Sequence, residues 1–112
     1  MTTVQTIIDD FGAEVLSLPE ANRTPRGVYC GDLLSWVMGH AVSDNVWVTV
    51  MTNLNVVAVA SLADVSCVII TDGSEIAPET VETAKSKGVN LLRTPLSSYE
   101  VCVRLSKLLG DS

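Results

Sequence analysis

The sequence has few aromatic residues, little positive charge and no long hydrophobic run. Two Trp, two Tyr and one Phe occur in 112 residues, so Val, Leu, Ile and Ala must fill the core. Seven basic residues stand against thirteen acidic ones, and the net charge of −6 is unsuited to nucleic acids and anionic membranes, which both require a positive surface. Because no run of 18 apolar residues occurs and the first residues lack the basic region of a signal peptide, we expect a cytoplasmic protein.

Residues that usually carry catalysis or bind metals are also scarce. The three cysteines, Cys30, Cys67 and Cys102, contain no Cys-x-x-Cys pair, which favours buried thiols over a disulfide framework or a metal site. The single histidine, His40, follows Gly39 and is expected to be an exposed residue after a helix. No G-x-x-x-x-G-K-[ST] phosphate-binding loop is present. We therefore expect no cofactor, no metal and no catalytic residues.

The sequence does contain an alternation of strand and helix patterns within one domain, residues 1–112. Apolar residues make up 47% and charged residues 18%, which is typical of a folded core. We expect strands at about 14–18, 28–30, 46–50, 66–70 and 89–92, and helices at about 3–11, 33–38, 53–62, 78–87 and 97–109. This order predicts an α/β fold of three layers: a mainly parallel sheet of about five strands with helices on both faces.

Cap residues set the expected helix ends. Thr2-x-x-Gln5 and Ser97-x-x-Glu100 have the spacing of capping boxes. Asp32 is the expected N-cap of the second helix, and Gly39 its expected end.

The chain is organised around residues 46–73, in which two apolar strands flank the helix expected at 53–62. That helix is apolar on nearly every side, so we expect its sheet to cover one face and a second copy of the chain to cover the other. The expected dimer interface consists of Leu54, Val56, Val57 and Val59. Trp36 and Trp47 are expected to serve packing or dimerisation.

Polar side chains follow the expected strands where each of them ends. In a parallel sheet ligands bind at the carboxyl ends of the strands, where helix N-termini also point. The candidate ligand-binding residues are Asp32, Thr52, Asn53, Thr71, Asp72, Gly73, Thr94, Ser97 and Ser98. Helix capping is the favoured explanation of Asp32, Thr52 and Ser97, and a turn is the favoured explanation of Gly73. Arg93, at the end of the fifth strand, is placed to reach an anion or to remain solvated.

Residues 66–109 resemble the C-terminal half of a DRTGG domain. The matching pattern is Thr71-Asp72-Gly73 after a strand, then Pro78, Gly88-Val89, Thr94-Pro95 and Ser97-Ser98-Tyr99-Glu100, and a looser match extends back to about residue 27. Asp72 replaces the first Gly of the family's Thr-Gly-Gly turn, and Thr52-Asn53 stand near the position of its Asp-Arg pair. The resemblance implies a three-layer α/β fold, self-association and a regulatory or ligand-sensing role.

Three functions remain open. The first is a non-catalytic regulatory domain that forms a homodimer and senses a small, possibly nucleotide-like ligand or a partner protein. The second is an assembly module without a ligand. The third is a small hydrolase or phosphotransfer enzyme that uses Asp32, Asp72 and His40.

Overall fold

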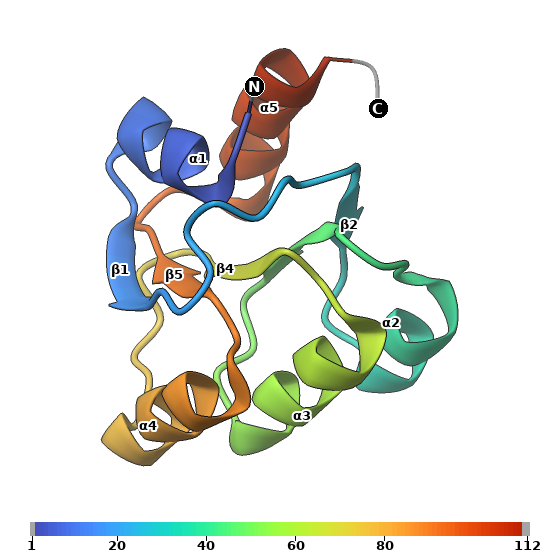
Figure 1. The fold of residues 1–112 in the computed structure, drawn as a ribbon, viewed down its shortest axis with the longest axis vertical. Helices are drawn as coiled ribbons and strands as arrows, with labels where there is room; N and C mark the ends of the chain where they lie inside the picture. Colours follow the sequence, from blue (N-terminus) through green and yellow to red (C-terminus); the bar gives the residue numbers. More distant parts are fainter. Residues whose placement is uncertain (1, 111–112) are drawn as a thin grey trace.

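A computed structural model describes residues 2–110 and shows one five-stranded sheet between two layers of helices (Figure 1). The strands are β1 (Glu14–Ser17), β2 (Val28–Cys30), β3 (Val46–Thr49), β4 (Cys67–Ile70) and β5 (Leu91–Arg93). The helices are α1 (Val4–Phe11), α2 (Leu34–His40), α3 (Leu54–Ala63), α4 (Pro78–Lys87) and α5 (Ser98–Leu109). The expected bounds differ from these by no more than two residues.

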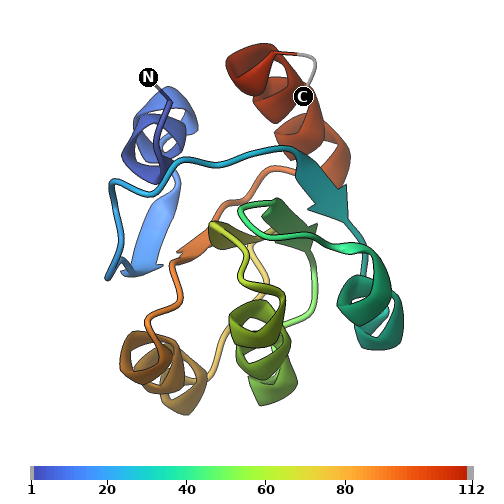
Figure 2. The same cartoon turned by 45° about the vertical axis from the view of Figure 1, so that its right-hand side comes forward.

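The strand order is β1-β5-β4-β3-β2, and the sheet is mostly parallel as expected. Strands β2 to β5 run parallel, while β1 pairs with β5 in the antiparallel direction. Helices α1 and α5 lie on one face of the sheet, and α2, α3 and α4 lie on the other (Figure 2). The carboxyl ends of the four parallel strands therefore share one edge, towards which α2 to α5 point their N-termini.

Each face of the sheet carries its own core because side chains alternate along a strand. On the face of α1 and α5, Val46 and Val48 of β3 join Cys67 and Ile69 of β4. On the other face, Trp47 packs between α2 and α3 residues and donates its Nε1–H to the Gly31 carbonyl at 3.0 Å. Trp47 is thus a core anchor.

Helix α3 corrects the expectation about the dimer interface. Val56, Val57 and Val59 are 1%, 0% and 8% exposed because the sheet and the flanking helices α2 and α4 cover them within one subunit. Only Leu54 of the four expected interface residues is exposed, at 46%. The premise that one chain cannot cover this helix is wrong for these valines.

Two expected helix starts and one end also differ. The capping box of α1 is formed by Thr3 and Thr6, because the Thr3 hydroxyl accepts from the Thr6 amide at 3.3 Å. The N-cap of α2 is Leu33, without a side-chain hydrogen bond, so Asp32 is not a helix cap. Helix α2 continues past Gly39 to His40. No helix in the described part of the chain has both the length and the apolar character needed to span a membrane.

Candidate functional site

Three buried threonines stand at the carboxyl edge, where β3, β4 and β5 end. Thr49, Thr71 and Thr94 are each at most 1% exposed. Because an unpaired hydroxyl is costly inside a protein, each one is bonded to a neighbouring loop. The Thr49 hydroxyl donates to Asp32, that of Thr71 bonds with Ser98, and that of Thr94 accepts from the Leu96 amide. These bonds connect the end of β3 to the loop after β2, the end of β4 to the start of α5, and the end of β5 to the loop that follows it.

Asp32 clamps the loops that follow β2 and β3. Its Oδ1 accepts the Thr49 hydroxyl at 2.7 Å and the Val50 amide at 3.0 Å. This carboxylate, predicted as a ligand-binding group or a cap, therefore holds two neighbouring loops together.

Residues 71–74 form a tight turn that packs against the loop before α5. Asp72 and Gly73 both have positive φ angles, 59° and 63°, and the Ser74 amide donates to the Thr71 carbonyl at 3.3 Å. This is the geometry in which an Asp-Gly pair is favoured. The Asp72 amide donates to Leu96 at 2.8 Å, and the Gly73 amide to Thr94 at 2.9 Å. Both amides therefore have hydrogen-bond partners within the protein.

Ser97 and Ser98 also have local roles. Ser97 caps α5 in the predicted capping box, because its hydroxyl accepts from the Glu100 amide while the Glu100 carboxylate accepts from the Ser97 amide, both at 3.1 Å. The Ser98 hydroxyl bonds with that of Thr71 at 2.9 Å.

Two open spaces lie beside these bonded groups. The larger, about 590 Å³, lies where α3 and α4 begin and is called the α3–α4 hollow; it is lined by Thr52, Asn53, Leu54, Glu75, Ile76, Ala77, Pro78, Glu79 and Thr80. The smaller, about 360 Å³, is called the Arg93 hollow; it is lined by Gly12, Glu14, Gly73, Glu75, Arg93, Thr94 and Pro95. Glu75 lines both, so the two hollows adjoin.

The charges of the two hollows differ. The α3–α4 hollow has two carboxylates, Glu75 and Glu79, and no basic residue in its lining. In the Arg93 hollow the guanidinium of Arg93 meets the Glu14 carboxylate, with Nη2 at 2.8 Å and Nε at 2.9 Å from Oε1. The expected anion partner of Arg93 is therefore a carboxylate of the neighbouring strand β1.

The predicted site residues thus fall into two groups. Thr52 and Asn53 line one hollow, while Gly73 and Thr94 line the other. The remaining candidates, Asp32, Thr71, Asp72, Ser97 and Ser98, support the edge through bonds within the protein.

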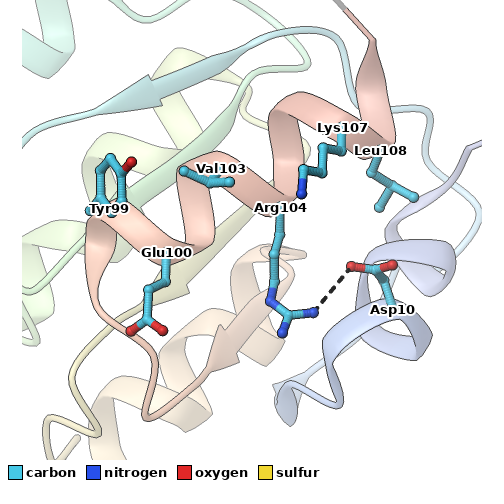
Figure 3. Close-up of a pocket in the computed structure, with 7 residues that line it drawn as sticks. All are labelled: Asp10, Tyr99, Glu100, Val103, Arg104, Lys107 and Leu108. Carbon is cyan, nitrogen blue, oxygen red and sulfur yellow. Dashed lines mark ion pairs between the residues drawn. The ribbon is translucent and has the colours of Figure 1, made fainter.

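A groove that the sequence did not predict runs between α1 and α5 (Figure 3). It measures about 590 Å³ and is lined by Asp10, Tyr99, Glu100, Val103, Arg104, Lys107 and Leu108. Arg104 points towards Asp10 of α1, with 4.0 Å between Nη1 and Oδ2. The sequence feature that could have indicated this groove is the pair of basic residues, Arg104 and Lys107, on the polar side of the last predicted helix.

The residues of the enzyme alternative engage separate partners. The His40 ring stacks on Trp36, with centroids 4.5 Å apart, and its Nδ1 lies 2.8 Å from the Trp36 carbonyl. Asp32 is bonded to Thr49 and Val50, and Asp72 accepts the Thr71 hydroxyl at 3.2 Å. Within residues 2–110, no group of three or more His, Cys, Asp or Glu residues is placed to hold a metal.

Comparison with known proteins shows what the chain as a whole resembles. The model of the DRTGG domain matches residues 6–108. No curated protein matches the chain. A similar fold occurs in the crystal structure of the CBS and DRTGG domains of the regulatory region of Clostridium perfringens pyrophosphatase, complexed with an activator, diadenosine tetraphosphate; the TM-score is 0.74 at 18% identity. The match covers 93% of this chain and 46% of that one, so the chain spans less than half of its structural neighbour.

Proposed function

The chain belongs to the DRTGG domain family, and from this membership we propose that it is a regulatory domain without catalytic activity that senses a small nucleotide-like ligand. The regulatory region of the pyrophosphatase, which contains a DRTGG domain, was solved with a dinucleotide activator. Because this chain matches less than half of that region, the activator's binding site there does not transfer directly to this chain. The ligand and its site are therefore argued from the hollows of this protein.

The observation that carries the proposal is the α3–α4 hollow at the carboxyl edge. Thr52, Asn53 and Thr80 offer hydroxyl and amide groups beside the starts of two helices. Glu75 and Glu79 accept hydrogen bonds from hydroxyl or amino groups, and a carboxylate is a common partner of a ribose hydroxyl. These carboxylates favour the nucleoside part of a ligand and disfavour its phosphates.

Arg93 is the basic residue that lines the hollow beside that nucleoside position. The Arg93 hollow adjoins the α3–α4 hollow at Glu75, and its guanidinium is held by Glu14. A phosphate that replaced the Glu14 carboxylate would receive the same two-pronged hydrogen bonding from Arg93. The proposed ligand thus places its nucleoside against Glu75 and Glu79 and its phosphate towards Arg93.

A thermal-shift titration with adenosine, AMP, ATP and diadenosine tetraphosphate tests this proposal. A ligand that binds only the native state raises Tm with its concentration. Glu75→Ala removes the exposed side chain that both hollows share and is expected to weaken binding by about tenfold or more, as for a charged hydrogen bond. The control is Glu82→Ala on α4, the helix that follows Glu75, because Glu82 pairs with Lys85 and lines neither hollow.

The results distinguish whether a nucleotide binds from where it binds. No shift with any of the four compounds at millimolar concentration would contradict nucleotide sensing. A shift that survives Glu75→Ala but disappears in Lys107→Ala would move the site to the α1–α5 groove.

We also propose that the regulatory domain pairs with a second copy through the outer side of α2 and α3. Most of the large exposed apolar side chains lie on or beside these two helices: Leu33, Trp36, Met38, Val42, Val50, Leu54 and Leu62. Helices α2 and α3 pack side by side in the same layer of helices on one face of the sheet (Figure 2). This apolar surface supports self-association, and it is also the observation that favours the alternative of an assembly module without a ligand.

A further inference from the structure

Two of the three cysteines meet between the edge strand β2 and the last helix. Cys30 is the final residue of β2 and is exposed, whereas Cys102 lies in α5 and is partly buried. Helix α5 packs against β2 and β3. Both cysteines line a hollow of about 430 Å³, called the thiol hollow, together with Val28, Leu105, Ser106, Leu109 and Gly110. Two residues far apart in the sequence therefore present their thiols to the same space.

The environments of the three thiols differ. Burial, and after it the neighbouring Cys30, together raise the pKa of Cys102 to about 11. Cys67 of β4 is fully buried in the core between the sheet and helices α1 and α5, and burial raises its pKa to about 12. Since the thiolate is the reactive form, Cys67 and Cys102 are poor first nucleophiles at neutral pH. Solvent reaches Cys30.

We propose that Cys30 and Cys102 form a site of reversible oxidative modification, at which a peroxide converts the two thiols into an intramolecular disulfide. Both cysteine side chains line the thiol hollow, so the fold brings the two thiols to one place. The proposal is independent of ligand sensing and needs no partner chain.

The chemistry takes place in two steps. The Cys30 thiolate attacks one oxygen of hydrogen peroxide, so the O–O bond breaks, Cys30 becomes a sulfenic acid and hydroxide leaves. The Cys102 sulfur then attacks the Cys30 sulfur, an S–S bond forms, and the Cys102 proton leaves with the hydroxyl group as water. In sum, two thiols and one hydrogen peroxide give one disulfide and two water molecules. Cys102 thus acts as the resolving thiol, and a small dithiol reverses the reaction.

The disulfide would connect the last helix to the edge of the sheet. Residues 30 and 102 are 72 positions apart, so the bond would restrict a large part of the unfolded chain. Closing a long loop in the unfolded state is expected to raise Tm. Oxidation would therefore stabilise the packing of α5 on β2 and close the thiol hollow.

The experiment treats the full chain with hydrogen peroxide, followed by intact mass measurement, alkylation of remaining thiols and a non-reducing peptide map. We expect a mass loss of about 2 Da, a linked peptide pair that contains residues 30 and 102, and a higher Tm, all reversed by dithiothreitol. Cys30→Ser and Cys102→Ser are each expected to abolish the link. Cys67→Ala is the matched control, because its thiol lies in the core, and it is expected to retain the link.

Two results would overturn the proposal. One is the stepwise addition of oxygen to Cys30 while Cys102 remains open to alkylation after unfolding. The other is a Cys30–Cys30 link between two chains in place of the internal one. The peptide map of the unmutated chain distinguishes both results from the expected one, so the outcome does not depend on whether a variant folds.

Discussion

Asp72 has a backbone conformation that most residues avoid. Its φ of 59° lies in the left-handed region, as does that of Gly73, and the Asp72 carboxylate accepts the Thr71 hydroxyl at 3.2 Å. Aspartate tolerates this region better than other non-glycine residues because its short polar side chain bonds to its surroundings locally. Asp72 therefore stands at a position whose backbone conformation explains why the family's Thr-Gly-Gly pattern has a glycine there.

We predict that Asp72→Gly changes the free energy of unfolding by no more than about 1 kcal/mol, because glycine adopts this conformation without strain. Asp72→Val is expected to destabilise the fold by about 1–2 kcal/mol, since a β-branched side chain is strained at positive φ. Urea unfolding measures both values. Glu75→Val, at an exposed position without a positive φ, controls for the lost charge, and a loss as large as that of Asp72→Val would contradict the backbone explanation.

The contacts of Asp32 could not be predicted from its position in the sequence. The sequence places an aspartate directly before a helix, and a cap is the ordinary interpretation of that position. In the structure the carboxylate bonds instead with Thr49 and Val50, which lie 17 and 18 positions further along the chain. Sequence spacing contains no information about this contact, because it arises only when β2 and β3 pair.

At the scale of elements, Arg23 joins three segments at the edge of the sheet opposite the candidate site. Its Nε donates to Asp44 at 3.0 Å, in the turn before β3, and its Nη2 donates to Asp64 at 2.8 Å, at the end of α3. Asp44 and Asp64 both have positive φ angles, 70° and 59°. The guanidinium thus links the loop before β2 to two strained chain reversals.

We predict that Arg23→Met lowers the free energy of unfolding by about 1–2 kcal/mol at pH 7, a modest value because the Asp64 side chain is 62% exposed. A hydrogen bond from Ser43, followed by that from Arg23, lowers the pKa of Asp64. A carboxylate with a lowered pKa contributes stability above its pKa in the unfolded chain, and this contribution is lost as pH falls through the folded value.

The destabilisation by Arg23→Met is therefore expected to shrink below about pH 4, where the carboxylates take up protons. Urea unfolding of both proteins at pH 7 and pH 3 measures the change. Arg23→Lys keeps the charge but not the planar fork and should give an intermediate loss. An equal loss at both pH values would mean that packing of the side chain, not charge, is the cause.

Helix α3 itself could be predicted from the sequence, but the neighbours that cover it could not. Its bounds and its uniform apolar character follow from the sequence, and Asn53 caps it with a 2.9 Å bond from the Asn55 amide. The sequence could not show that α2 and α4 would flank the helix and bury its valines. A helix that is apolar all round is equally compatible with a second copy and with neighbours from its own chain.

At the scale of the whole molecule, the proposed pairing concerns the outer side of α2 and α3. Trp36 is 55% exposed and Leu54 is 46% exposed, and burial of such side chains favours association. We predict that the parent chain sediments as a dimer, and that Trp36→Glu combined with Leu54→Glu gives a folded monomer. Sedimentation velocity measures this, and circular dichroism checks the fold.

The matched control for the dimer is Tyr99→Glu, because Tyr99 is 77% exposed on α5, across the sheet from α2 and α3. This variant should remain a dimer. A parent chain that is monomeric at high concentration would contradict self-association, and loss of the dimer in Tyr99→Glu would place the interface on the opposite layer.

The sequence by itself determined the order and type of the elements, the mostly parallel sheet and the family, because apolar periodicity, cap residues and turn chemistry act over short distances along the chain. Only the tertiary structure decided which polar groups stay available. Pairing of the strands uses Asp32, Thr71 and Asp72 within the protein, and leaves the hollows beside Thr52 and Arg93 open. It also brings Cys30 to Cys102, since contacts between distant residues arise only when the layers pack.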